Sequence, residues 1–256
     1  MAQQILSVGR RGIWIGGAIG GVLLWRIAAY ASPSSFIAIP EGLHLPHALL
    51  GILFLAAGAW AWWRRPNQWT QLFLITGIAF GIHWGGAVGI TNPAIEMSVF
   101  WVYLALSALG DSALLHLALI YPHGRPLSRS WRNVLYLPAL AAVMLAPVAI
   151  FVPQNALRVA IGTMLLIAPL LSLAAGVVFT VRLFIADAAT RRAARLPLIV
   201  AGLWAGGITA HLGAANLLPG VPEAWNLALA LLPITFAIAL THQSSAHPGD
   251  HEHAGR

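Results

Sequence analysis

The few residues of this chain that could do chemistry lie inside apolar stretches. Asp111, Ser112 and His116 fall close together in one of them. Asp111 and His116 are five positions apart, so on a helix they point about 140° apart and should not pair. Ser112 and His116 share a helical face, but no glycine-framed nucleophile elbow or oxyanion loop accompanies them. We therefore expect no catalytic site and no enzyme.

Asp111 is the clearest buried ionisable group, because it sits deep within its apolar segment. An ionisable residue at the centre of a membrane helix costs about 2.5 kcal/mol or more. We expect it to face the interior, mostly protonated, with a polar partner from another helix or a water. A structural hydrogen bond and a ligand-binding or proton-coupled role are both open.

Two histidines lie at comparable depth in their apolar segments. His83 and His211 each follow the arginine-rich start of a segment by about 15 residues. This placement permits a haem, chlorin or metal between two helices, but imidazole is also an ordinary interhelical hydrogen-bonding group. No cofactor or metal is assigned. The histidines near the C-terminus do not have the spacing of a rigid metal site: His242, His247, His251 and His253.

Composition defines the elements that must position these residues. Of 256 residues, 59% are hydrophobic and 8% charged, against about 25% charged in soluble domains. Apolar runs of about 20 residues, the length that crosses a bilayer, recur along the chain. We predict an all-α, polytopic membrane helix bundle over residues 1–241, with a short, His-containing, disordered cytoplasmic tail over 242–256. The eight predicted spans are Gly12–Ala31, His47–Trp63, Trp69–Ile90, Ser98–Tyr121, Asn133–Val152, Val159–Phe184, Leu196–Ala215 and Asn226–Thr241.

The basic residues predict the topology. The net charge is +7, and most arginines lie in loops that the eight spans place on one side. The other side has Glu41, Glu96 and Glu223, with Arg26 and Arg158 as its only arginines. The positive-inside rule then puts both termini in the cytoplasm of a bacterium, with the chain in the inner membrane. The arginines orient helices, so we expect the lipid bilayer and another membrane protein as partners, and no nucleic acid.

Small residues at four-residue spacing predict helix contacts. The third span has Gly77, Gly81, Gly85 and Gly89 in this register. Further pairs occur in the first and seventh spans: Gly16/Gly20, Gly17/Gly21 and Gly202/Gly206. Small residues let membrane helices approach closely, so we expect these faces to be seams, within the chain or between subunits.

Three segments carry a family resemblance. They are His116-Leu-Ala-Leu-Ile-Tyr121-Pro-His-Gly-Arg125-Pro with Trp131 and Tyr136-Leu-Pro138, the stretch Arg191-Arg192-Ala-Ala-Arg195-Leu-Pro-Leu-Ile-Val-Ala-Gly202, and Leu231-Leu-Pro233-Ile-Thr-Phe-Ala-Ile-Ala239. Together they resemble the membrane sensor domain of bacterial histidine kinases, including the peptide-pheromone quorum-sensing type. The 256 residues contain no phosphoacceptor helix or ATP-binding segment, so the resemblance concerns the membrane module alone. It implies that His116, Pro122 and Arg125 are structural elements at the inner membrane face.

Three functions are consistent with these features. The first is a non-enzymatic sensor or receptor-like module in signal transduction, which binds a ligand within the bundle or signals through a partner. The second is an accessory or scaffold subunit of a larger respiratory or photosynthetic membrane complex, with a haem or chlorin as an open option. The third is a small-solute transporter, for which paired broken helices in inverted halves are lacking.

Overall fold

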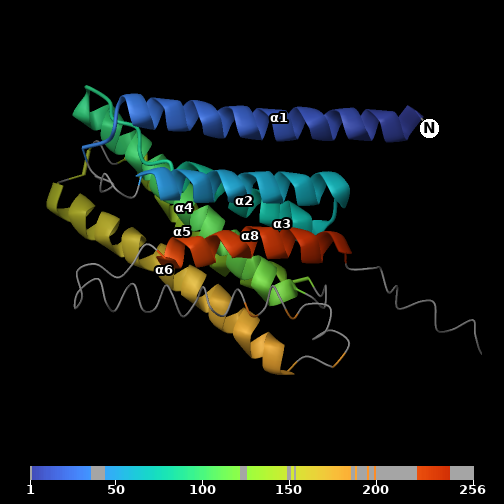
Figure 1. The fold of residues 1–256 in the computed structure, drawn as a ribbon. Coiled ribbons are helices and arrows are strands. Elements are labelled where there is room, and N and C mark those ends of the chain that lie inside the picture. Colours follow the sequence, from blue (N-terminus) through green and yellow to red (C-terminus); the bar gives the residue numbers. More distant parts are fainter. Residues whose placement is uncertain are drawn as a thin grey trace, which may run out of the picture.

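The computed structural model describes residues 2–35, 44–121, 126–148, 151–152, 154–185 and 224–242, with 188, 195 and 199. Within these residues the fold is all-helical, which confirms the predicted class, and its one extended pairing is an isolated bridge between Pro33 and Val88. The helices are α1 (Ala2–Ala31), α2 (His44–Arg64), α3 (Gln68–His83), α4 (Pro93–Ile120), α5 (Arg129–Leu145), α6 (Gln154–Ile185) and α8 (Ala224–His242). Figure 1 shows them side by side in one bundle.

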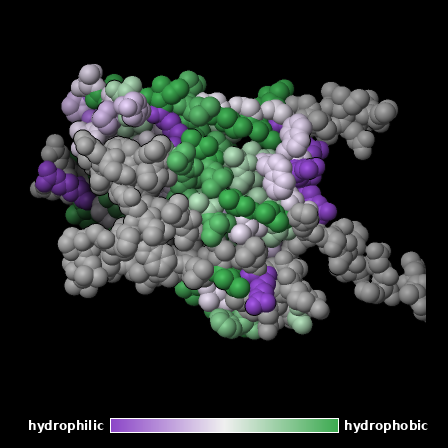
Figure 2. Space-filling model, viewed as in Figure 1, coloured by the Kyte–Doolittle hydropathy of each residue, from purple (hydrophilic) through white to green (hydrophobic). Residues whose placement is uncertain are grey.

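Each predicted span except one overlaps a described helix, and Leu196–Ala215 lies almost wholly outside the described residues. The fifth predicted span, Asn133–Val152, overruns its helix, which ends at Leu145. Among the described residues, three helices are long and apolar enough to cross a membrane: Arg11–Ala31, Pro93–Ile120 and Arg158–Arg182. Shorter apolar helices cover Ala48–Arg64 and Ala230–Thr241. In Figure 2 hydrophobic residues occupy the middle of the visible face, and the most hydrophilic ones lie mainly towards its edges.

α4 is the central helix of the described bundle. It packs against α3, α5 and α6, whereas α2 joins α3 to α8. In its apolar window 78% of residues are buried, against 11% for α1 and 25% for α6. An aromatic cluster fills the core around it, with Phe179 and Phe236 at 4.9 Å between ring centroids and Tyr121 beside both. Polar residues on α4 are therefore the ones that the fold encloses most completely.

The predicted third span is wrong at its C-terminal end. α3 stops at His83 instead of continuing to Ile90. The chain turns at Gly86, whose φ of 90° is readily adopted only by glycine, and residues 87–89 then pair with the segment that follows α1. The amide of Gly89 donates to the carbonyl of Ser32 at 2.6 Å, and the amide of Ser34 to that of Ala87 at 3.1 Å. Hydrophobicity continued past the true helix end because this turn is itself buried against α1 and α4.

The glycine row keeps its close contacts although half of it is not helical. A Cβ at Gly77 would lie 2.5 Å from the carbonyl oxygen of Phe54 on α2, and one at Gly81 would lie 3.0 Å from Val22 on α1. Gly85 and Gly89, in the turn, adjoin Arg26 and Pro33. The row is an intrachain seam, as expected, but only its first half is a helical stripe.

The glycine pairs of α1 form no seam with other described residues of this chain, and a seam between subunits stays a prediction. A Cβ at Gly16, Gly17, Gly20 or Gly21 would meet no heavy atom within 4 Å. α1 touches α3 and α2 chiefly through its C-terminal half, where Val22 and Ala29 are buried. Gly202 and Gly206 lie outside the described residues.

Candidate functional site

The candidate site is the buried polar face of α4, and the start of this helix shows why it folds there. Asn92 caps it, with a side-chain oxygen that accepts from the amides of Ala94 and Ile95, and Pro93 occupies the first turn. From there α4 runs without a break to Ile120. Asp111, Ser112 and His116 are all buried on it. Asp111 makes its polar contact with α6, whereas Ser112 and His116 contact two different residues of α5.

Asp111 is joined to α6. Its side chain is 6% exposed, and the hydroxyl of Ser172, itself buried, donates to Oδ1 of Asp111. The carboxyl group thus faces the interior, with a neutral partner on another helix. A hydroxyl partner satisfies one oxygen without introducing a second charge, which suits a low-dielectric setting.

Ser112 and His116 are joined to α5. The Ser112 hydroxyl donates to the carbonyl oxygen of Leu135 at 2.8 Å. The Nδ1 atom of His116 lies 3.0 Å from the Tyr136 hydroxyl, and the two rings meet edge-on at 5.8 Å between centroids. Pro138 lies inside α5 and has no amide hydrogen. The carbonyl of Val134, four residues earlier, therefore lacks its usual helical donor, which loosens the backbone hydrogen bonding there.

One atom of this face has unused hydrogen-bonding capacity. Nε2 of His116 is buried without a hydrogen-bond partner in the described part of the chain. A buried polar atom without a partner costs about 1–3 kcal/mol, so such an atom calls for a water, ion or ligand. The face is therefore a binding candidate at His116 and a helix-joining contact at Asp111.

The geometry does not make a catalytic set of these residues. Ser112 and His116 bond to α5 and not to one another, and Asp111 bonds to α6. A nucleophile needs a base within hydrogen-bonding reach and a group that orients the base. Nor do the described residues include a group of three or more His, Cys, Asp or Glu that could hold a metal ion.

His83 is placed away from this face. It ends α3, its ring stacks on that of Tyr103 at 5.3 Å between centroids, and the Tyr103 hydroxyl donates to the His83 carbonyl at 3.0 Å. Tyr103 precedes Asp111 by eight residues, or about 12 Å along α4. His211 lies outside the described residues, so the proposed pair of His83 and His211 stays a prediction.

Sequence reasoning missed the role of Arg26, which it placed only near a helix end. Its Nε donates to the Gly81 carbonyl and its Nη1 to the Ala48 carbonyl, both at 2.7 Å. Gly51 and Gly85 leave the space that the side chain fills. The arginine thereby satisfies a carbonyl in the last turn of α3 and favourably complements the helix dipole. An arginine within an apolar run was the available signal.

Two further polar contacts fasten the ends of α4. At its start the Glu96 carboxylate accepts from the hydroxyl of Ser34 and the amide of Ser35, both at 2.8 Å. At its end the Arg182 guanidinium donates to the carbonyls of Leu119 and Tyr121. From the sequence, Glu96 was interpreted only as a marker of topology.

Comparisons with protein-family models, with curated proteins and with solved structures give no match for this chain.

Proposed function

We propose that this chain is a non-enzymatic integral membrane module of sensor or receptor type, which binds a ligand within its bundle or signals through a partner membrane protein. In this proposal it crosses the bacterial inner membrane about eight times, with both termini in the cytoplasm. The resemblance to histidine-kinase sensor domains belongs to the same proposal.

The observation that carries the proposal is the set of polar contacts on α4. Asp111 bonds to α6 while Ser112 and His116 bond to α5, so one central helix is held in register with two neighbours by a few directional contacts. A ligand that competes for these groups changes which register is favoured. Because Nε2 of His116 is buried and unsatisfied in the described residues, a ligand has a group to bind there.

The charge distribution supports the proposed topology. Arg64 ends α2, Arg129 and Arg132 begin α5, and Arg182 lies near the end of α6. In an antiparallel order these helix ends fall on one side of the membrane, which the positive-inside rule makes cytoplasmic. Glu96 lies near the start of α4 and Arg158 near the start of α6, and the same antiparallel order puts these two helix ends on the other side.

An accessory subunit of a larger membrane complex is the second candidate, and α1 is the observation that favours it. A Cβ at any of its four glycines from Gly16 to Gly21 would contact no described part of another helix within 4 Å, and Trp14 beside them is 73% exposed. Such a helix can pack against a neighbouring protein as readily as against lipid.

Spin-label distances test the sensor proposal directly. The chain has no cysteine, so Ser130→Cys in α5 and Ile185→Cys at the end of α6 can be labelled cleanly; both positions are exposed. In lipid vesicles, Asp111→Leu should shift the label distance by about 2 Å, the size of a helix shift in signalling. Asp111→Asn should leave it unchanged. An unaltered distance in Asp111→Leu would mean a rigid bundle and would reject coupling through α4.

An absorption spectrum of the protein purified in mild detergent from its own membranes separates the two candidates. The sensor proposal expects no Soret or chlorin band. A pigment band would favour the accessory subunit.

A further inference from the structure

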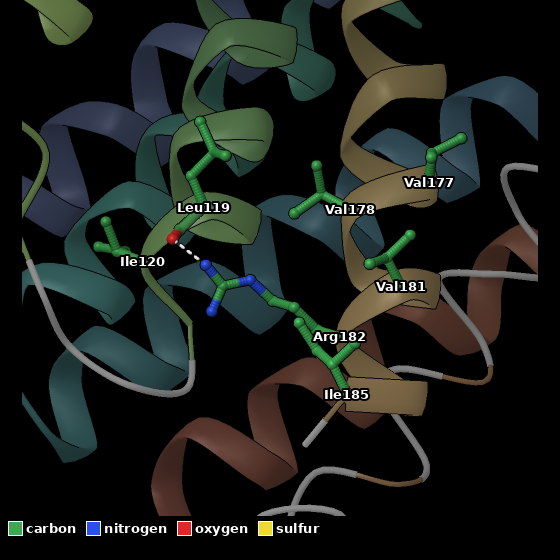
Figure 3. Close-up of a pocket in the computed structure, with 7 residues that line it drawn as sticks. All are labelled: Leu119, Ile120, Val177, Val178, Val181, Arg182 and Ile185. Carbon is green, nitrogen blue, oxygen red and sulfur yellow. Dashed lines mark hydrogen bonds between the residues drawn. The ribbon is translucent and has the colours of Figure 1, made fainter.

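The last turns of α4 and α6 enclose a groove that the sensor proposal does not use. It has a volume of about 480 Å³ and is lined, in the described residues, by Leu119, Ile120, Val177, Val178, Val181, Arg182 and Ile185. Figure 3 shows Arg182 extending from α6 towards the carbonyl of Leu119, with the aliphatic residues around it. The groove is thus apolar along its length and cationic at one point.

The groove runs along α6 for about two helical turns. Val177, Val181 and Ile185 follow one another at four-residue spacing, which places them on one face about 6 Å apart. Val177 and Val181 are about half exposed and Ile185 is 74% exposed. An apolar strip of this shape is open to the surroundings and accepts a linear apolar group.

A second cation faces the same end of α4 from α5. Tyr136 bonds to His116, and Arg132 lies four residues before Tyr136, on the same face of α5 and one turn nearer to its start. Ile120 likewise lies one turn beyond His116 on α4, and the two helices are antiparallel neighbours. Arg132 is therefore level with Ile120, so Arg132 and Arg182 flank the last turn of α4.

Arg132 is available to a ligand. It is exposed, and within the described part of the chain its side chain makes no hydrogen bond or ion pair. It also stands with Arg129 in the first turn of α5, where the helix dipole favours anions and no acidic residue is present. Trp131 beside it is 67% exposed, as an aromatic residue at the membrane–water interface would be.

We propose that this groove binds an anionic phospholipid, with one acyl chain along Val177 and Val181 and the phosphate at Arg132, beside the last turn of α4. An apolar strip with two arginines near one end matches an amphipathic anion better than it matches a partner helix, which would have to bury both cations. Basic pockets between membrane helices are also where anionic headgroups bind. The proposal rests on the membrane location given under the proposed function, but not on a sensor role.

Thermal unfolding with added lipid is the test. In mild detergent, phosphatidylglycerol should raise the Tm of the wild-type protein by about 3 °C or more, whereas phosphatidylcholine at the same ratio should not. Arg132→Gln should remove at least half of that rise, and Val181→Phe, which fills the groove at a half-exposed position, should remove it. Native mass spectrometry should show phosphatidylglycerol retained by the wild type, reduced in Arg132→Gln and lost from Val181→Phe.

Matched variants at other places on α6 provide the controls. Arg158→Gln removes an exposed arginine from the opposite end of the helix, and Leu170→Phe enlarges an exposed residue outside the groove. Both should keep the full lipid effect. Val177→Phe replaces Val181→Phe if the latter does not fold.

Several results would overturn the proposal. Equal stabilisation by phosphatidylcholine would mean that the negative charge of the lipid does not contribute to binding. An equal loss in Arg158→Gln would indicate non-specific lipid around the bundle. Stabilisation by inorganic phosphate alone, dependent on Arg132, would identify a soluble anion as the ligand instead. An unchanged lipid effect in Arg132→Gln and in Val181→Phe would place the lipid elsewhere.

Discussion

At the scale of residues, this protein is defined by polar groups that have found partners on neighbouring helices. Asp111, Ser112 and His116 each use a different acceptor or donor, and the two arginines Arg26 and Arg182 bond to backbone carbonyls at helix ends. In lipid no water is at hand to replace a lost partner, so such contacts determine register.

The Asp111–Ser172 contact can be tested by two substitutions, one that keeps a hydrogen-bonding side chain and one that removes it. Asp111→Asn keeps a hydrogen-bonding side chain and should cost less than about 1 kcal/mol. Asp111→Leu leaves the buried Ser172 hydroxyl without this acceptor and should cost about 1–3 kcal/mol. Thermal unfolding in detergent measures both.

Ser172→Ala is the control, because Asp111→Leu should add little in that background. If Asp111→Asn proves as damaging as Asp111→Leu, the negative charge itself is needed, and an ion-coupled role gains over a structural one.

The His116–Tyr136 contact should behave differently. Tyr136→Phe removes only the hydroxyl and leaves Nδ1 of His116 without its partner, so unfolding should become easier by about 1 kcal/mol. Chemical or thermal unfolding of the purified variant gives the value. Tyr103→Phe, which loses a hydroxyl bond to a backbone carbonyl at the other end of α4, serves for comparison. A neutral Tyr136→Phe would show that this hydrogen bond does not hold α5.

At the scale of elements, glycines decide how closely α2 and α3 approach. Gly58 and Gly51 on α2 and Gly77 on α3 lie against the backbone of the opposite helix. The four glycines of α1 have no such neighbour. The same residue type at the same spacing therefore has two different roles in one chain.

Alanine substitution separates these roles. Gly77→Ala places a methyl group against the Phe54 carbonyl and should destabilise the protein by about 1–3 kcal/mol. Gly16→Ala meets open space and should be neutral or stabilising by up to about 1 kcal/mol, because alanine favours the helix. The melting temperatures of the two variants in detergent check this. A destabilising Gly16→Ala would reveal a contact on α1, such as a partner subunit.

At the scale of the whole molecule, the arrangement of charge predicts which end of the bundle faces the cytoplasm. We expect that a membrane-impermeant maleimide labels Arg158→Cys in intact cells, and that Arg64→Cys and Ser130→Cys react only after the membrane is opened. All three positions are exposed, so access and not burial decides the result. Labelling of Arg64→Cys from outside would reverse the topology, and labelling of all three would refute a spanning bundle.

Composition and periodicity alone determined the class of fold. A chain that is 59% hydrophobic, in runs of membrane length with no polar alternation, satisfies its backbone in lipid by forming helices, and each predicted span that the described residues cover contains a helix. The depth of Asp111 within its segment also determined that it needed a partner. These conclusions follow from local properties, because helix length and burial cost depend on neighbouring residues in the chain.

Only the tertiary structure decided which residues meet. Ser172 carries no signal of its own, and Tyr136 entered only through the family resemblance, yet they complete the contacts of Asp111 and His116. The end of α3 at His83 and the niche of Arg26 likewise depend on α1, which pairs with the turn and fills the space that glycines leave. Contacts between helices depend on how each one is rotated and how deeply it lies. In uniformly apolar segments a periodic pattern does not specify rotation, so close packing and a few hydrogen bonds decide it.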